Sequence, residues 1–145
     1  MAELLLIVRL AGRRIALAAR EIEAVVELDG LTPVPGAPAH VAGLSALRSR
    51  VLTVIDSRAS LGFAAEEGAG TVEAMVVPSG GHTYALLVEQ IDDVIEAASE
   101  AGPVLAPPGP GWERVAKGVV EVGGDLLLLA DPHLLIAGPP VLAAA

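Results

Sequence analysis

Short apolar runs separated by turn residues dominate the chain, and this pattern predicts strands rather than long helices. Some runs mix apolar and polar positions, as residues 22–28 do, which is typical of a half-buried strand. The proline-rich segment 32–38 interrupts the series, because proline lacks the N–H that a central strand or a helix interior uses. We therefore predict five strands in each half of the chain, at residues 4–10, 15–18, 22–28, 44–47 and 51–55, and at residues 72–77, 84–88, 91–95, 119–122 and 126–129.

Helix is expected in few places. Alanine is the best helix former, so one helical turn within residues 16–27 is an alternative to strand, although the frequent glycines favour strands. Pro132 is suited to the first turn of a short closing helix over residues 132–135. We expect a single domain at residues 1–137 and a loose tail at residues 138–145.

The two halves of the chain repeat one pattern. Shifts of 69 and then 75 residues superpose equivalent positions, among them Gly12 and Gly81, Gly43 and Gly118, and Asp56 and Asp131. These ordered matches favour a duplicated unit over a chance alignment of amphipathic hairpins. Each unit has one apolar face that the other unit can cover, so we predict two lobes packed over a shared aliphatic core.

One turn breaks the repeat. The second half has Gly123-Gly124 between two strands, and the first half has Arg48-Ser49 at the equivalent turn. Glycine at both turn positions suits a backbone with positive φ. Arg48 is therefore explained either by a different turn type or by a function, in which its guanidinium offers two hydrogen bonds to a partner carboxylate or backbone.

Composition narrows the classes of function. Apolar residues make up 53% of the chain and aromatic residues only 2%, so the core is aliphatic and a stacking surface for single-stranded nucleic acid is hard to build. The net charge of −9 argues against nucleic-acid binding, which relies on clustered basic residues. The absence of cysteine excludes disulfides, thiolate metal sites and cysteine nucleophiles, and it fits a reducing compartment.

Catalytic and metal-binding patterns are not visible in the sequence. None of the three histidines, His40, His82 and His133, has the spacing of a metal ligand set or a short cluster with carboxylates. Asp92 and Asp93 are neighbours on a predicted strand, so their side chains point to opposite faces and do not form an acid–base pair. We therefore expect no enzyme activity, no metal and no cofactor.

The N-terminal segment does not indicate export or membrane insertion. Its apolar run is broken by Arg9 and has no basic region before it, so no signal peptide is expected. No stretch of about 18 apolar residues is free of charge, as a membrane-spanning helix requires. We expect a cytoplasmic protein without direct membrane insertion.

Several motifs, taken together, resemble one protein family. Residues 31–35 are rich in proline, residues 43–48 read Gly-Leu-Ser-Ala-Leu-Arg, and residues 51–56 read Val-Leu-Thr-Val-Ile-Asp. With residues 86–91, 117–119 and 127–131, they resemble the CheW family of adaptor proteins in bacterial chemotaxis-type signalling. The resemblance runs in order from about residue 4 to residue 136.

The resemblance implies a fold and a role. The fold is all-β, with two SH3-like five-stranded β-barrel lobes around a shared core, and the role is non-enzymatic. Proteins of this family couple chemoreceptor tips to a CheA-type histidine kinase, by binding the regulatory domain of the kinase and the cytoplasmic hairpin of the receptor. Arg48 matches an arginine that the family uses at these contacts. We therefore expect the partner-binding residues to be Ile22, Ala24, Val25, Val41, Gly43, Arg48 and Arg50.

Departures from the family pattern concentrate near the same residues. Ala46 stands at the motif asparagine, Ser49 at its glycine and Thr53 at a strand proline, and Ala24 replaces a glutamate that contacts partners. These departures leave open whether the chain serves flagellar chemotaxis or another chemosensory pathway.

An alternative function is a divergent β-barrel module without these partners. An aliphatic groove between the lobes could bind an apolar small ligand, and exposed edge strands could self-assemble. Neighbouring genes for a receptor and a histidine kinase would favour the adaptor, and a co-purifying ligand would favour the alternative.

Overall fold

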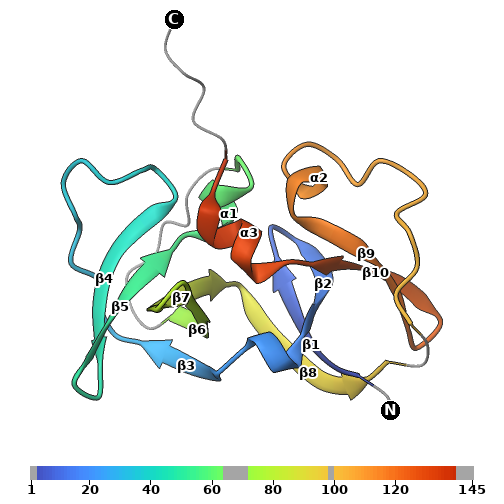
Figure 1. Ribbon diagram of the computed structural model, residues 1–145, viewed down its shortest axis with the longest axis horizontal. Helices are drawn as coiled ribbons and strands as arrows, with labels where there is room; N and C mark the ends of the chain where they lie inside the picture. The colour runs from blue at the N-terminus through green and yellow to red at the C-terminus, as the bar shows by residue number, and fades with distance from the viewer. Residues whose placement is uncertain (1–2, 64–71, 98–99, 140–145) are drawn as a thin grey trace, which may run out of the picture.

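The computed structural model describes residues 3–63, 72–97 and 100–139 of the 145-residue chain (Figure 1). Within these ranges the all-β prediction is confirmed, because ten strands form two five-stranded sheets. The strands are β1 (Leu4–Leu10), β2 (Arg13–Ala18), β3 (Ala24–Leu28), β4 (Val41–Leu47), β5 (Arg50–Ile55), β6 (Val72–Ser79), β7 (His82–Val88), β8 (Gln90–Glu96), β9 (Ala116–Val122) and β10 (Asp125–Ala130). The helices are the 3-10 turn η1 (Ala19–Glu21) and the α-helices α1 (Ser57–Ser60), α2 (Trp112–Val115) and α3 (Pro132–Ala137). The end of the predicted tail, residues 140–145, lies outside the described residues.

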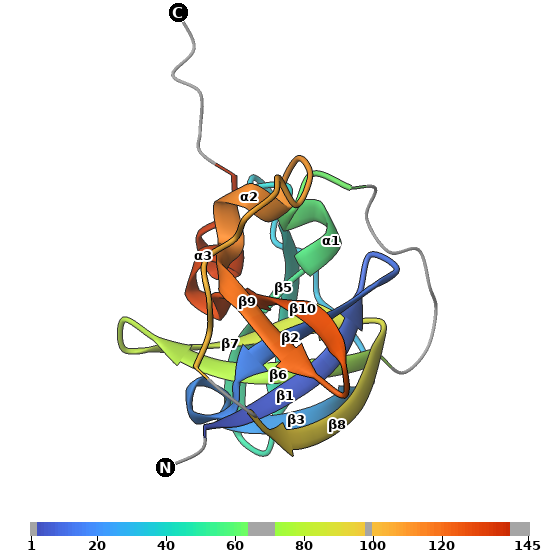
Figure 2. The same ribbon diagram turned by 90° about the vertical axis from the view of Figure 1, so that its right-hand side faces the viewer.

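Each sheet combines strands from both halves of the chain. The sheet of lobe 1 has the order β3-β6-β7-β5-β4, and the sheet of lobe 2 has the order β8-β1-β2-β10-β9. The hairpin β1–β2 therefore belongs to the lobe that holds the second-half strands β8, β9 and β10, and β6–β7 belongs to the other lobe. Figure 1 shows the two lobes side by side, with α1 and α3 above the line where they meet, and Figure 2 looks from the side of lobe 2, with α1, α2 and α3 at the top.

Strand pairing follows the sequence repeat. A shift of 75 residues carries β4 onto β9 and β5 onto β10 with identical bounds. The parallel pairs also correspond, since Thr53 lies opposite Tyr84 in lobe 1 and Leu128 lies opposite Ile15 in lobe 2. The predicted duplication is therefore confirmed in the pairing of the strands.

The repeated glycines on β4 and β9 have a steric cause. A Cβ atom on Gly43 would lie 2.5 Å from the carbonyl oxygen of Thr32, and one on Gly118 would lie 2.6 Å from that of Gly102. In both lobes the preceding loop forms a single β-bridge with the edge strand, at Leu44 in lobe 1 and at Val119 in lobe 2. Because the loop crosses so closely, a side chain at either glycine would push it away.

Three aliphatic cores explain why the strands are so apolar. On β1, Leu5 and Ile7 pack inside lobe 2, and Leu6 and Val8 pack in the central core between the lobes. The strand β6 divides its side chains in the same way between the interior of lobe 1 and the central core. A strand that is buried on both faces has no solvent side, so it reads as a continuous apolar run.

Two aspartates begin equivalent helices. Oδ1 of Asp56 accepts the N–H of Ala59 at 3.1 Å at the start of α1, and Oδ1 of Asp131 accepts the N–H of His133 at 2.9 Å at the start of α3. Aspartate at this position satisfies a backbone donor that the helix leaves unpaired. The closing helix is confirmed and extends to Ala137, whereas α1 was not predicted, although the match of Asp56 to Asp131 indicates it.

Arg114 joins the three α-helices into a cap over the central core. From α2, its guanidinium donates to the carbonyl oxygen of Ser60 at 2.8 Å, to the Ser60 hydroxyl at 2.9 Å and to the carbonyl oxygen of Leu134. The hydroxyl of Ser60 in turn donates to the carbonyl oxygen of Leu135 at 2.7 Å. Burial lowers the pKa of Arg114 from its usual value, so this cation is partly desolvated.

The two-residue turns of the four hairpins in the described chain all have a left-handed backbone. Gly123 and Gly124 have φ values of 56° and 88°, and Arg48 and Ser49 have values of 50° and 69°. The first half therefore keeps the turn type of the second half, and the interpretation that a different turn type explains Arg48 is wrong. A left-handed conformation costs a non-glycine residue roughly 1–2 kcal/mol, so this hairpin tip is strained.

Glu89 ties three parts of the molecule together. Its Oε1 accepts the N–H of Gly12 in the β1–β2 turn at 3.0 Å, and its Oε2 lies 2.6 Å from a guanidinium nitrogen of Arg58 on α1. Burial by itself raises the pKa of Glu89, but the hydrogen bonds from the N–H groups of Gly12 and Ala11 and from Arg58 outweigh it. The pKa of Glu89 consequently lies below its ordinary value.

None of the helices in the described residues could cross a bilayer, because the longest, α3, has six residues. A bilayer-spanning helix needs about 20.

The strain at the β4–β5 turn predicts that Ser49→Gly stabilises the protein. Removing the left-handed penalty, offset by the greater freedom of glycine in the unfolded chain, should raise the free energy of unfolding by about 0.5–1 kcal/mol. Urea unfolding measures the change. The matched control is Gly124→Ser in the equivalent turn, which should lose a similar amount, and a loss of stability in Ser49→Gly would contradict the argument.

The lowered pKa of Glu89 predicts a pH-dependent contribution to stability. A carboxylate with a depressed folded-state pKa stabilises the fold above its unfolded value, near 4.5, and this contribution is lost as the pH falls through the folded value. Glu89→Gln should therefore lose about 1 kcal/mol at pH 7 and differ little from the wild type near pH 3. Unfolding at both pH values tests this. Glu121→Gln, on the exposed face of β9, should show no such dependence, and an equal loss at both pH values would contradict the role of the charge.

Candidate partner-binding surface

Four predicted partner-binding residues line one groove on lobe 1. Ala24 and Val25 lie on β3, and Arg48 and Arg50 come from the β4–β5 hairpin. Because β3 and β4 are the two edges of one sheet, the curl of that sheet brings these residues together. The groove has a volume of about 550 Å³ and is completed by Glu23, Val26, Leu47 and Val76. We call it the arginine groove.

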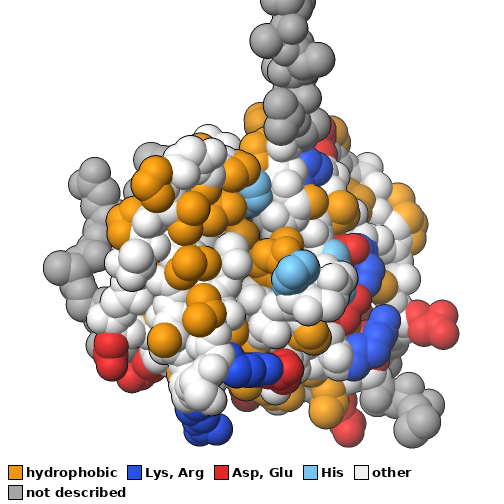
Figure 3. Space-filling view, turned by 60° about the vertical axis from the view of Figure 1, so that its left-hand side comes forward, with side chains coloured by type: hydrophobic (Ala, Val, Ile, Leu, Met, Phe, Trp, Pro, Cys, Tyr) orange, Lys and Arg blue, Asp and Glu red, His pale blue; other side chains and the backbone are white. Residues whose placement is uncertain are grey.

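Charge in the arginine groove is unevenly compensated. Arg50 forms an ion pair with Glu23 at 2.6 Å, and both side chains are more than 40% exposed, so the pair contributes little to stability. Among the residues that the structure describes, Arg48 has neither an ion-pair nor a hydrogen-bond partner. Figure 3 shows basic and acidic side chains along the lower edge of a lobe surface that is otherwise rich in apolar side chains. The hairpin tip thus offers a free cation on a protein whose net charge is −9.

Ile22 lies in an adjoining apolar groove, at the junction of the lobes. Ala24 and Val25 from lobe 1 and Val94 from lobe 2 also line this groove, together with Leu6 and Ala19. Its volume is about 140 Å³. Val25 and Val94 are 45% and 54% exposed, whereas valines such as Val8, Val54 and Val76 are completely buried. We call it the inter-lobe groove.

Val41 and Gly43 lie outside both grooves. Val41 is half-buried and packs against the central core. Gly43 is buried beneath the carbonyl oxygen of Thr32. The structure therefore gives Val41 a part in the packing of the central core and Gly43 a part in the packing of lobe 1, and it separates both from the other five predicted residues.

Sequence reasoning missed seven residues of these grooves. Glu23 and Leu47 flank the arginine groove, and Val94 completes the inter-lobe groove. A signal for Val94 exists, because a shift of 69 residues carries Val25 onto it. The repeat thus contributes the same valine from each half to one groove.

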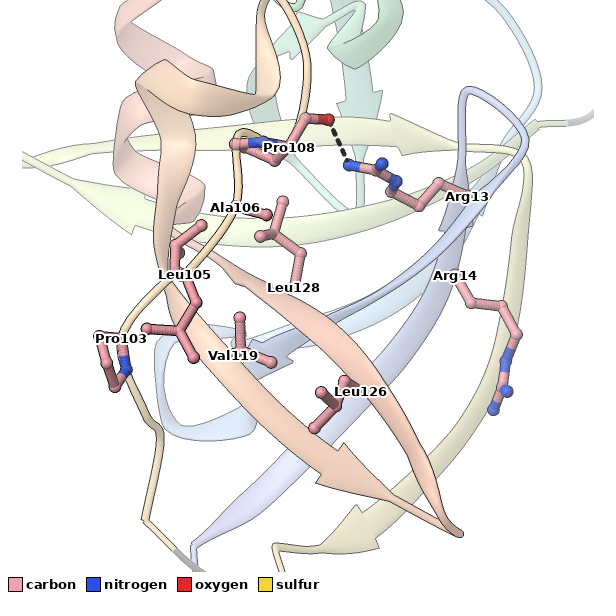
Figure 4. A pocket seen from close by; sticks show the side chains of 10 residues that line it. Arg13, Arg14, Pro103, Leu105, Ala106, Pro108, Val119, Leu126 and Leu128 are labelled. Carbon is pink, nitrogen blue, oxygen red and sulfur yellow. Dashed lines mark hydrogen bonds between the residues drawn. The ribbon is translucent and has the colours of Figure 1, made fainter.

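A third hollow lies on lobe 2, beneath the loop before α2 (Figure 4). It has a volume of about 340 Å³, and its apolar wall includes Leu105 and Leu126, which are 90% and 74% exposed. Arg13 borders it and is already engaged, since it donates to the carbonyl oxygen of Pro108 at 2.9 Å and lies 5.2 Å from the centre of the Trp112 ring. This hollow contains none of the predicted partner-binding residues.

Known proteins share this fold and these motifs. A model described as the CheW-like domain matches residues 4–139. A protein of Rhizobium meliloti (strain 1021), "Chemotaxis protein CheW", is 31% identical over 114 residues, which cover 76% of this chain and 74% of that protein. The crystal structure of the scaffolding protein TtCheW from Thermoanaerobacter tengcongensis is similar in fold, with a TM-score of 0.79 at 20% identity, over 93% of this chain and 92% of that one. The chain therefore belongs to the CheW-like domain family.

Proposed function

We propose that this CheW-like adaptor of chemotaxis-type signalling couples chemoreceptor tips to the regulatory domain of a CheA-type histidine kinase, in the cytoplasm and without enzyme activity of its own. The observation that carries the proposal is the placement of a free cation, Arg48, beside an exposed apolar strand, β3, in a chain of this family. The family consists of non-catalytic adaptors. The absence of cysteine supports a reducing compartment.

The inter-lobe groove suits the receptor. A chemoreceptor tip is a helical hairpin, and an apolar groove is the usual docking site for the apolar face of a helix. Val25 and Val94 present exposed apolar surface from both lobes, and Ile22 lies between them and the core. A helix in this groove would cover valines that are now in contact with water.

The arginine groove suits the regulatory domain of the kinase. Its rim carries two arginines and one glutamate, so an acidic or backbone-carbonyl surface complements it. Ala24 leaves the rim more positive than in a typical relative, because the family resemblance places a glutamate at that position. The departure at Ala24 therefore favours a kinase partner that is more acidic at this contact than the partner of a typical relative.

A second candidate, the binding of an apolar small ligand, is favoured by one observation. The hollow on lobe 2 lies within the size range of small-molecule sites and is walled by Pro103, Leu105 and Leu126. Native mass spectrometry of the purified protein would detect a co-purifying ligand. An adaptor without such a ligand should appear at the mass of the polypeptide alone.

Charge reversal at the hairpin tip tests the arginine groove. Arg48→Glu should weaken at least one of the two complexes by more than about 1 kcal/mol, because a cation at an interface becomes a repulsive anion. Titration against the kinase regulatory domain and the receptor hairpin from the same organism measures the loss. Arg9→Glu, on β1, adds the same charge outside the groove and should leave both affinities unchanged. If Arg48→Glu binds both partners as tightly as the wild type does, Arg48 has no role in binding and is only part of the turn.

Polar substitution in the inter-lobe groove separates the two partners. Val94→Ser should weaken receptor binding at least fivefold, which is about 1 kcal/mol, and should leave kinase binding within twofold. The control is Leu126→Ser, which removes a more exposed apolar side chain elsewhere on lobe 2. Loss of kinase binding alone would reverse the assignment of the grooves, and the absence of any binding by the wild type would refute the adaptor.

A further inference from the structure

A side chain from near residue 20 meets two from near residue 132 beside η1, the segment that crosses between the lobes. Glu21 ends η1, which leads from β2 in lobe 2 to β3 in lobe 1. Asp131 is the N-cap of α3, and His133 lies in its first turn. One potential ligand atom from each of the three lies within 4.8 Å of the other two. The sequence does not reveal this cluster, because the fold alone brings residue 21 to residues 131 and 133.

One oxygen of the cluster has no hydrogen-bond partner within the described part of the chain. Oε2 of Glu21 is buried and accepts no hydrogen bond from the described residues. Its other oxygen, Oε1, lies 3.6 Å from Nζ of Lys117, and the Glu21 side chain is 18% exposed. Buried carboxylate oxygens normally accept a hydrogen bond or contact a cation, because an unpaired one costs free energy. Binding of a cation at Oε2 of Glu21 would remove that cost.

The other two ligands are held in place. Oδ1 of Asp131 accepts the N–H of His133 at 2.9 Å, which fixes the carboxylate against the helix. Nδ1 of His133 lies 3.1 Å from the hydroxyl of Ser79, and this contact leaves Nε2 available to a metal. Hydrogen bonds to the second imidazole nitrogen and to ligating carboxylates are the usual support for metal ligands in proteins.

The positions that the sequence repeat relates to the cluster carry different residues. The repeat places Gln90, Asp56 and Arg58 at the positions of Glu21, Asp131 and His133. There Arg58 lies in a 2.6 Å ion pair with Glu89, whose counterpart under the same shift is Arg20. The cluster has an imidazole at the position of Arg58 and a carboxylate at the position of Gln90, and its own cation, Lys117, lies 3.6 Å from only one oxygen of Glu21.

We propose that Glu21, Asp131 and His133 bind a divalent transition-metal ion such as Zn²⁺. One imidazole and two carboxylates form a mixed nitrogen and oxygen donor set, which suits zinc, whereas calcium and magnesium prefer oxygen alone. The ion ties the crossover turn η1 to the closing helix α3. The residue that follows η1 is Ile22 of the inter-lobe groove, so the metal holds one end of that groove in place.

Titration of the full chain, without a histidine tag, tests the proposal with Zn²⁺ as the probe. Isothermal calorimetry should show one saturable site with a dissociation constant below about 100 µM. Glu21→Gln and His133→Ala should each weaken binding by roughly tenfold or more. His82→Ala removes an exposed histidine outside the cluster and should leave binding unchanged. Millimolar Mg²⁺ should not compete.

Lys117→Met provides a variant with the opposite effect. Its ammonium is the positive charge nearest to Glu21, so its removal should tighten Zn²⁺ binding several-fold. A purely structural role of these residues would not produce a gain in affinity. No saturable binding by the wild type, or equal binding by wild type, Glu21→Gln and His133→Ala, would overturn the proposal. Circular dichroism of each variant shows whether a lost site reflects a lost fold.

Discussion

The burial of two hairpins on both of their faces is the constraint on which the rest of the structure depends. β1–β2 and β6–β7 each direct one row of side chains into a lobe and the other row into the central core. Such a hairpin cannot face water on either side without exposing a row of leucines, isoleucines or valines. The lobes therefore cannot separate. The caps, turns and grooves are arranged around a core to which both lobes contribute side chains.

The sequence predicts the strands and the repeat because both depend on local patterns. Apolar runs, glycine pairs and the aspartates at positions 56 and 131 are all visible along the chain. The exchange of hairpins between the lobes is not visible, because pairing between distant strands leaves no local signal. The helix α1 was missed for a different reason: it is a single turn, and only its capping residue, Asp56, distinguishes it from a loop.

The candidate site could be predicted only in part. The break in the repeat at Arg48 identifies the hairpin tip, and the curl of the sheet then brings that tip to Ala24 and Val25. Val41 and Gly43 match the family motif but contribute to packing, Val41 against the central core and Gly43 beneath the loop of lobe 1, because residues of a family motif can be required by the fold as well as by a partner. The repeat thus accounts for the framework of the two lobes, whereas the charge at the hairpin tip comes from a position, Arg48, at which the two copies differ.

The exchange of hairpins has a consequence for synthesis on the ribosome. Lobe 1 lacks its inner strands β6 and β7 until residues 72–88 have left the exit tunnel, and lobe 2 lacks β9 and β10 until residues 116–130 follow. The nascent β1–β2 hairpin emerges before β8 and β10 and must wait for both of them before its two edges are paired. Such long-range pairing slows folding and leaves apolar edges open to wrong partners in the meantime. The architecture that makes the finished adaptor a single body therefore leaves its unfinished chain with unpaired apolar strand edges during translation.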